Sequence, residues 1–407
     1  MSAVPTGSGR TLPDGWRWMS MGDIAEVVGG GTPRTTEPAN FDGGDVPWIT
    51  PADLSGYTEK YISHGSRFIT RKGLESSAAR LLPAGTILFS SRAPIGYVAI
   101  ARNPIATNQG FKSFVLKDSV LPEYVYWWLK GSKQRAEKLA SGTTFLEISG
   151  ANAKKIPIPI APIEQQRKIV SEIEKQFSRL DESVANLKRV AAKVGIYRNS
   201  VLSSICDGEA PRRPLGSLLR ESLRNGHSAK AVVSGDGVPT FTLSAVTEGN
   251  FSDCNVKQTS ANPDRVRDLW VKRGDIFVER SNTPELVGTA RLYQGNDDRA
   301  IFPDLLIRVR VADSVLPEWA ELCLLSPLLR RYFKSRAQGI AGSMPKIDQE
   351  VVSEALIPVP SVAIQKQLVG EAERRFSVAA ELEAQACTAL ARASRLRYSI
   401  LASAFSI

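Results

Sequence analysis

The chemistry offered by this sequence is that of binding rather than of catalysis. It contains no GxxxxGK[ST] phosphate loop, and the glycines at 29–31 lack the strand–GxGxxG–helix context of a dinucleotide site. It also lacks the Asn/Asp-Pro-Pro-aromatic box that amino-methyltransferases use at their target base. His64 and His227 lie in unlike contexts, and the four cysteines show no CxxC spacing, so no catalytic histidine or metal site is expected.

The side chains that remain suit contacts to phosphates and base edges. Phosphates are bound by Lys, Arg, hydroxyls and backbone N–H groups, and bases by Arg, Lys, Asn and Gln. The candidates in the first part of the chain are Thr32, Arg34, Thr35, Arg67, Arg71, Lys72, Ser91, Arg92, Thr143 and Thr144. Those in the second part are Arg224, Asn225, Lys230, Arg265, Arg267, Arg280, Ser281, Asn282, Ser343 and Lys346.

Two arginines stand out from this set, Arg92 and Arg280, because an arginine follows a predicted strand in both parts of the chain. The tripeptide Asn108-Gln109-Gly110 suits base readout by type. Its neighbours Phe111 and Phe114 favour a buried, structural role at least as strongly.

An internal repeat organises the elements that must position these residues. Residues 158–206 recur as residues 357–405, at a constant offset and without a gap, so that Gln166 matches Gln365 and Arg198 matches Arg397. The segment Asp-Ser-Val-Leu-Pro-Glu also occurs twice, at 118–123 and 313–318. The chain is therefore expected to consist of two half-molecules in tandem.

Each copy of the repeat predicts one long helix with a heptad seam. The seam positions are Ile173, Phe177, Leu180, Val184, Leu187, Ala191, Val194, Arg198, Val201 and Ile205 in the first copy. In the second copy they are Ala372, Phe376, Ala379, Glu383, Ala386, Leu390, Ala393, Arg397, Ile400 and Ala404. At several matching seam positions, one copy has a small side chain where the other has a large one. A dimerisation coiled coil would give the same pattern, but the tandem arrangement favours an antiparallel pair within the chain.

The segments before the helices mix short strands, turns and helices, which indicates an α+β fold. We expect globular domains at 13–155 and 209–352, and long helices within 156–208 and 353–407. The expected architecture is two similar domains in tandem, each followed by a long helix. The two helices would form an antiparallel coiled coil with pseudo-two-fold symmetry. At about 1.5 Å per residue, each helix would span roughly 65–70 Å, about two turns of B-DNA.

Composition narrows the class of partner and the compartment. The net charge of +10 over 407 residues points to an acidic partner, most plausibly nucleic acid. Scattered cysteines are typical of a reducing cytoplasm, and no run of residues suggests a signal peptide or a membrane span.

Proline-led helix openings occur at 156–170 and 357–369, and the first part of the chain contains Gly30-Gly31-Thr32-Pro33 and the segments 91–96, 107–111 and 142–144. In these motifs the chain resembles the specificity (S) subunit of type I restriction–modification systems. The resemblance covers about residues 13–405.

The resemblance implies a non-catalytic subunit whose two domains are target-recognition domains, each reading half of a bipartite sequence in double-stranded DNA. The helices would set the spacer and dock two methyltransferase subunits and the restriction and translocation subunits. S-adenosylmethionine and ATP would be bound by those partners, and this chain would need no cofactor or metal. Candidate docking residues on the polar helix face are Gln166, Arg167, Lys175, Arg179 and Lys188.

Two alternatives stay open at this stage. The chain could be a coiled-coil assembly protein that binds no DNA, in which case salt would have little effect on its binding. It could also be a DNA methyltransferase with unrecognised motifs, in which case the isolated chain would bind the cofactor.

Overall fold

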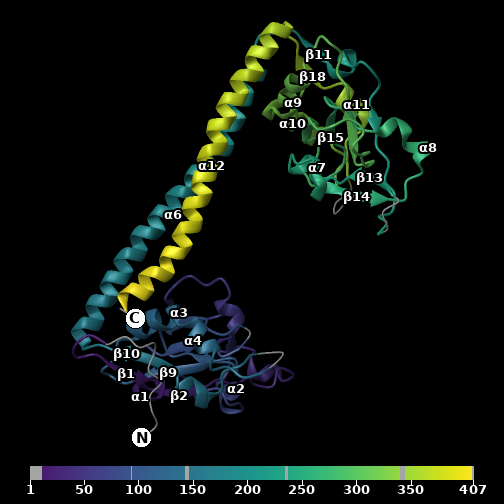
Figure 1. The fold of residues 1–407 in the computed structure, drawn as a ribbon. Coiled ribbons are helices and arrows are strands. Elements are labelled where there is room, and N and C mark those ends of the chain that lie inside the picture. The colour runs from purple at the N-terminus through teal and green to yellow at the C-terminus, as the bar shows by residue number, and fades with distance from the viewer. Residues whose placement is uncertain (1–11, 93, 143–145, 234–236, 340–343, 406–407) are drawn as a thin grey trace. The chain divides into compact units, whose positions relative to one another are not determined.

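The computed structural model describes residues 12–92, 94–142, 146–233, 237–339 and 344–405. Two compact units make up the chain: unit 1 comprises Met1–Asn186 with Ala389–Ile407, and unit 2 comprises Leu187–Thr388. Figure 1 labels the elements of both units. Each unit contains a globular α+β part and segments of two long helices, α6 (Ile163–Cys206) and α12 (Val362–Ala404).

The globular part of unit 1 is built on a five-stranded sheet of order β2-β9-β6-β7-β4. A three-stranded sheet of order β5-β3-β8 and the pair β1-β10 complete its strands. The strands are β1 (Arg17–Ser20), β2 (Ala25–Gly29), β3 (Val46–Ile49), β4 (Tyr61–Ile62), β5 (Arg67–Ile69), β6 (Ile87–Phe89), β7 (Val98–Ala101), β8 (Ala106–Thr107), β9 (Lys112–Leu116) and β10 (Pro157–Ile160). The helices are α1 (Met21–Ile24), η1 (Pro38–Asn40), η2 (Pro51–Leu54), α2 (Arg71–Glu75), α3 (Pro122–Gly131), α4 (Lys133–Glu137) and α5 (Gly150–Lys154).

The globular part of unit 2 repeats this plan with a four-stranded sheet of order β12-β17-β15-β16 and the pairs β13-β14 and β11-β18. Its strands are β11 (Arg212–Pro214), β12 (Arg224–Asn225), β13 (Val238–Phe241), β14 (Val256–Thr259), β15 (Ile276–Glu279), β16 (Ala290–Leu292), β17 (Leu306–Val309) and β18 (Leu356–Pro358). Its helices are η3 (Leu215–Leu218), α7 (Ser244–Thr247), η4 (Asp253–Asn255), α8 (Pro263–Val266), η5 (Arg267–Leu269), α9 (Pro317–Leu325), α10 (Pro327–Arg336) and α11 (Gln349–Ser353).

One predicted helix boundary was wrong. Residues 158–160, expected to open the long helix, belong to β10, whose proline-rich strand pairs antiparallel with β1. Proline is tolerated in such an edge pair but not inside a helix.

The long helices pack antiparallel within each unit. In unit 1, Asp181 bonds to Arg397, and one hollow is lined both by Ile169 and Ile173 of α6 and by Ile400, Ser403 and Ala404 of α12. In unit 2, Arg198 pairs with Glu383 at 3.0 Å, and Val201 and Ile205 share a core with Ala372. In both units the residue numbers therefore rise along one helix as they fall along the other.

The heptad seam is confirmed by burial. In unit 1 the buried seam residues are Ile173, Phe177, Leu180, Ala393 and Ile400. In unit 2 they are Val194, Val201, Ile205, Ala372, Ala379 and Ala386. The charged seam residue Arg198 lies against Glu383, also a seam residue, so a cross-helix ion pair replaces an apolar contact there.

A buried glutamine fastens each globular part to its long helix. In unit 1, Gln166 accepts a bond from the N–H of Leu121 (3.0 Å), at the start of α3, and donates to the carbonyl of Ala161 (2.8 Å). In unit 2, its repeat partner Gln365 accepts from the N–H of Leu316 (2.8 Å), at the start of α9. It donates to the carbonyls of Ser314 (3.0 Å) and Pro360 (2.9 Å).

A second bond accompanies each glutamine. The Tyr124 hydroxyl in α3 donates to the carbonyl of Pro159 (2.7 Å), and the Trp319 indole in α9 donates to that of Pro358 (2.8 Å). The C-terminal end of α12 also lies beside α3 in unit 1, where Phe405 packs on Tyr124 at 5.1 Å between ring centroids (Figure 1).

The buried glutamine gives the first prediction. Because Gln365→Ala leaves the Leu316 N–H and two carbonyls without their partner in a buried place, it should lower the free energy of unfolding by about 2–4 kcal/mol. Gln385→Ala, at an exposed position of the same helix, should change it by less than about 0.5 kcal/mol. Urea titration followed by circular dichroism measures both. An effect of Gln365→Ala as small as the control's would show that the glutamine does not fasten α12 to unit 2.

The turn after β3 gives a prediction of pH dependence. Asp53 accepts bonds from the N–H groups of Thr50 (2.7 Å) and Ser66 (2.8 Å) and from both hydroxyls (2.7 Å each). Burial opposes the charge of this carboxylate, but the bonds outweigh it and hold the pKa of Asp53 below its ordinary value of 3.8. A lowered pKa contributes stability above the unfolded-state value, and this stability is lost as the pH falls through the folded-state value.

We therefore expect Asp53→Asn to be less stable than the natural chain at pH 7. The difference should begin to shrink as the pH falls below about 5, because the carboxyl of the unfolded chain takes up its proton first, and it should shrink further as the pH falls toward the lower folded-state value. Urea midpoints measured across this range provide the comparison, with Asp45→Asn as an exposed control in the same unit. A difference that stayed constant with pH would contradict the assignment.

Candidate nucleic-acid interface

In unit 1 the segments that carry five of the ten predicted contact residues meet at one cluster of loops. The backbone joins them: Gly31 N–H donates to Thr107 (2.9 Å), Asn108 N–H to Ile49 (2.9 Å), and Ser91 N–H to Gly110 (2.8 Å). Ile148 N–H donates in turn to the carbonyl of Ser91 (2.9 Å). We call this set of segments, 30–35, 49–51, 91–92, 107–110 and 147–148, the loop cluster of unit 1.

Glycine is required where two of these loops meet. A Cβ atom on Gly30 would lie 1.9 Å from the carbonyl oxygen of Asn108, and one on Gly31 would lie 2.2 Å from the backbone nitrogen of Ala79. Only residues without a Cβ allow so close an approach of two backbones. The Gly-Gly-Thr-Pro motif therefore sets the position of Thr32, whose hydroxyl donates to the Oε1 atom of Gln109.

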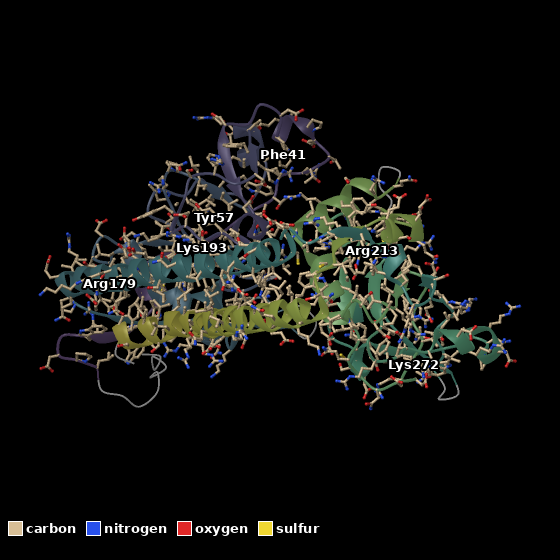
Figure 2. The ribbon with its side chains drawn as sticks, turned by 90° about the horizontal axis from the view of Figure 1, so that it is seen from above. Phe41, Tyr57, Arg179, Lys193, Arg213 and Lys272 are labelled. Atoms are coloured by element: carbon tan, nitrogen blue, oxygen red, sulfur yellow. The ribbon has the colours of Figure 1, made fainter. Side chains whose placement is uncertain are left out.

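Arg67 is presented on an aromatic platform beside this cluster. Its guanidinium lies 4.5 Å from the ring centroid of Phe41 and 5.4 Å from that of Trp48. The Trp48 indole donates to the carbonyl of Gly31 (3.0 Å), which ties the platform to the glycine loop. A stacked arginine keeps its planar N–H groups for a phosphate or a base edge. Phe41 is labelled in Figure 2.

The other candidates in unit 1 occupy different environments. Arg34, Thr35, Arg71 and Lys72 are exposed, with Arg34 3.9 Å from Glu37. Arg92 lies 3.9 Å from the carboxylate of Glu147, so part of its charge is neutralised within the unit. Ser91 is buried and its hydroxyl donates to the Gly110 carbonyl (3.1 Å), so its predicted contact with DNA was wrong. Thr143 and Thr144 lie outside the described residues.

Unit 2 repeats the loop cluster with different side chains. His227 N–H donates to Phe302 (2.9 Å), Arg280 N–H to Leu305 (2.8 Å), and Ile347 N–H to Arg280 (2.9 Å). These bonds match those made in unit 1 by Gly31, Ser91 and Ile148. A Cβ atom on Gly226 would lie 2.1 Å from the Phe302 carbonyl oxygen, the counterpart of the contact at Gly30.

These matches give the register of the two candidate arginines that each follow a strand. Arg280 occupies the place of Ser91, and Ser281, which pairs with Lys346 in a short bridge, occupies that of Arg92, which pairs with Glu147. Arg92 and Arg280 are therefore not equivalent, because the backbone bonds align them one residue apart. The Glu147 position carries exposed Lys346 in unit 2, so the sign of the charge differs between the two clusters.

The remaining candidates in this part of unit 2 are partly committed to internal bonds. Ser281 is buried, which excludes it from a surface contact and makes that prediction wrong. Asn282 donates to Glu279 (2.7 Å), a carboxyl whose pKa is raised by burial. The Asn225 amide lies 3.0 Å from that of Gln349. Lys230 and Arg265 are exposed, and Ser343 lies outside the described residues.

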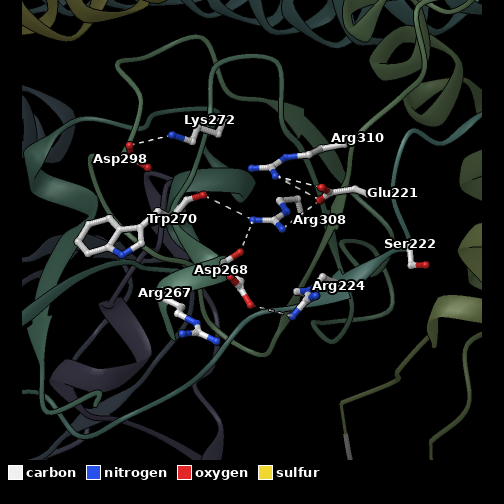
Figure 3. A pocket seen from close by; sticks show the side chains of 10 residues that line it. All are labelled: Glu221, Ser222, Arg224, Arg267, Asp268, Trp270, Lys272, Asp298, Arg308 and Arg310. Carbon is white, nitrogen blue, oxygen red and sulfur yellow. Dashed lines mark hydrogen bonds and ion pairs between the residues drawn. The ribbon is translucent and has the colours of Figure 1, made fainter. Parts of the chain in front are cut away.

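A basic hollow of about 880 Å³ lies beside β12 and β17 in unit 2 (Figure 3). Arg224, Arg267 and Lys272 line it, so the structure brings two of the predicted candidates together. Arg308 of β17 and Arg310 just after it also line the hollow and were missed from the sequence, because arginines in and beside a strand are not distinguishable there from surface residues.

Arg308 and Arg310 are held by internal partners. Arg308 donates to Glu221 (3.1 Å) and to the Asp268 carbonyl (3.1 Å), and burial lowers the pKa of its guanidinium. Arg310 donates to Asp275 through its Nη2 atom (2.9 Å), a bond that raises its pKa. Their charges are thus balanced within unit 2, and the exposed Arg267 is freer to meet an external anion.

On the long helices, one predicted docking residue was wrong. Gln166 is buried and fastens α3, as described above. Arg167, Lys175, Arg179 and Lys188 are exposed on α6, from which Arg179 projects in Figure 2. The exposed apolar side chains of α6 and α12 outside the seam were not predicted from the sequence. In the helical segments of unit 2 these include Val190, Ile196, Tyr197, Val378 and Leu382.

In the part of the chain that the structure describes, no group of three or more His, Cys, Asp and Glu side chains could hold a metal ion. None of the helices in that part is both long enough and apolar enough to cross a membrane.

Comparison with known proteins bears on these loop clusters. Residues 13–190 match the family described as type I restriction modification DNA specificity domain. The MjaIX specificity subunit of Methanocaldococcus jannaschii is 44% identical over 181 residues, which is 44% of this chain and 40% of that protein. The EcoKI specificity subunit of Escherichia coli K12 is 24% identical over 97% of this chain and 89% of its own length.

Solved structures share the fold over nearly the whole chain. A chain from a structure described as the basis of complex assembly and conformational transition of the type I R-M system has a TM-score of 0.74, at 18% identity, over 97% of this chain and 99% of its own. The HsdS subunit of Thermoanaerobacter tengcongensis gives 0.60, also at 18% identity, over 98% of both chains. Residues 13–190 are thus similar to the type I restriction modification DNA specificity domain, and the solved structures show that the fold is shared over nearly the whole chain.

Proposed function

We propose that this chain is the sequence-reading subunit of a type I restriction–modification complex, and that each unit reads one half of a bipartite DNA target. The observation that carries the proposal is the duplicated loop cluster. The same backbone bonds hold it in both units, while the side chains on it differ. Variable side chains on a constant scaffold are typical of recognition surfaces.

Charge and side-chain type favour double-stranded DNA as the ligand. The chain carries a net charge of +10, and exposed cations in unit 1 include Arg34, within the loop cluster, and Arg71 and Lys72 of α2. Phosphate contacts of this kind set the affinity and the docking position, while side chains on the loops would read base edges.

In this proposal the long helices set the spacer between the half-sites. Each is a continuous helix of more than forty residues, 44 in α6 and 43 in α12, or about 65 Å of rise. Their exposed apolar side chains, together with Arg167, Lys175, Arg179 and Lys188, would dock two methyltransferase subunits, which the restriction and translocation subunits would join. Those partners would carry S-adenosylmethionine and ATP, and this chain would take part in no chemical step.

The spacer role can be tested by changing helix length. Deleting four residues at facing positions of both helices removes about one turn from each and should shorten the unread gap while leaving both half-sites unchanged. The methylated sequences of cells that carry the variant with its methyltransferase partner give the result. Inserting four Gly/Ser residues after Asp118, in an exposed turn, should leave the gap unchanged. A deletion that altered the half-sites but not the gap would contradict the spacer role.

The platform beside the loop cluster gives a second test. Arg67→Ala should weaken DNA binding by the assembled complex about tenfold and reduce the salt slope by about one phosphate contact. Arg67→Lys should restore the slope but not the full affinity, because lysine keeps the charge without the planar stacked fork. Titrations at several salt concentrations measure both quantities. Arg17→Ala, on β1, is the matched control, and equal losses from the two alanine variants would contradict a role for Arg67 at the interface.

A further inference from the structure

One position in the loop cluster of unit 1 corresponds to one in unit 2: the same backbone bonds hold both, but the side chains differ. In unit 1 the segment Thr107-Asn108-Gln109-Gly110 accepts bonds from the N–H groups of Gly31 and Ser91 at its first and last residues. In unit 2 the segment 302–305 accepts the same two bonds, from His227 and Arg280. Gln109 and Asp304 are therefore structural equivalents, although the two segments share no residue type.

The support around this position is retained in both units. Gly30 and Gly226 allow the segment that carries Gln109 or Asp304 to approach closely. In each unit a hydroxyl from the glycine's own loop reaches the side chain at the tip of that segment. Thr32 donates to the Oε1 atom of Gln109, and Ser228 donates to the Oδ1 atom of Asp304. Each hydroxyl fixes one oxygen of the tip side chain and leaves its second polar atom, Nε2 or Oδ2, for an external partner.

The shape of the tip does not depend on the side chain itself. In unit 1 the turn is closed by Asn108, whose Oδ1 atom accepts from Gly110 N–H (2.9 Å). In unit 2 it is closed by Pro303, whose carbonyl accepts from Leu306 N–H (3.1 Å). The Gln109 side chain is exposed, and Asp304 is half-buried. The position can therefore vary in chemistry without altering the fold, which is what a specificity position requires.

The two groups differ in what they can read. A glutamine amide both donates and accepts, and it matches the N6 and N7 edge of adenine in the major groove. A carboxylate only accepts, and it matches the N4 amino group of cytosine. A carboxylate is also repelled by phosphates, so Asp304 suits a base edge and not the DNA backbone.

We propose that Gln109 and Asp304 are equivalent specificity-determining residues, each reading one base of its half-site: Gln109 an adenine and Asp304 a cytosine. The inference rests on the proposed function, since it assumes that the loop clusters face DNA. It adds to that function the residues that distinguish the two half-sites and the bases they select.

The test uses the full chain with its methyltransferase partner in cells, and maps methylated bases genome-wide. Gln109→Glu changes one N–H₂ donor to an acceptor at constant size, and Asp304→Asn makes the reverse change. Each should reduce methylation of the original target about tenfold in initial rate, and should change or relax a single base position in one half-site. The two variants should affect opposite half-sites.

Matched substitutions elsewhere in each unit provide the controls. Gln134→Glu, exposed on α4, and Asp313→Asn, exposed in the turn before α9, should leave the target and its methylation rate unchanged. Thermal melting of the purified variants shows whether each chain is folded, so that a loss of methylation can be assigned to recognition.

The outcomes separate the two levels of the proposal. A folded Gln109→Glu variant with an unchanged target would overturn the specificity assignment and leave the proposed function standing. Equal loss at every position of both half-sites would also overturn it, because that result indicates a structural role. If no methylated sequence depended on the natural chain, both the proposed function and the inference built on it would fail.

Discussion

The arrangement of each unit depends on one buried hydrogen-bonded side chain, the glutamine in the first turn of its long helix. Gln166 in unit 1 and Gln365 in unit 2 bond to the first N–H of a globular helix and to the strand segment that precedes the long helix. Burying an amide is favourable only when its donors and acceptors are satisfied. The glutamine therefore fixes where the helix leaves the globular part, and the position of any recognition loop relative to that helix follows from it.

On this foundation the two units use one scaffold for different surfaces. Backbone bonds between loops, and glycines where backbones touch, hold the loop clusters of both units. Because these interactions involve no particular side chain, the residues at the tips are free to differ. The clusters accordingly differ in charge where Glu147 corresponds to Lys346, and in hydrogen-bonding character where Gln109 corresponds to Asp304. Duplication followed by change at such positions provides two different surfaces on one fold.

The sequence was sufficient to predict the features that depend on local periodicity. The heptad seam is confirmed by the buried Ile173, Phe177 and Ala379, since helical spacing alone decides which side chains meet. Gln166 was assigned to a docking surface because a polar residue off the seam is usually exposed. Arg92 and Arg280 each follow a strand in the sequence, but loops of unequal length hide the backbone register, in which Arg280 corresponds to Ser91. The equivalence of Gln109 and Asp304 was invisible for the same reason, and only the bonds between distant loops reveal it.

The central claim is that the two units read separate half-sites, and the most direct measurement is base-resolution mapping of methylated DNA in cells that carry this chain with its methyltransferase partner. Cells that lack this chain supply the background. The account predicts a single asymmetric target made of two specific parts separated by a gap of fixed length and free sequence. A continuous target without a gap, or methylation that does not depend on this chain, would contradict it.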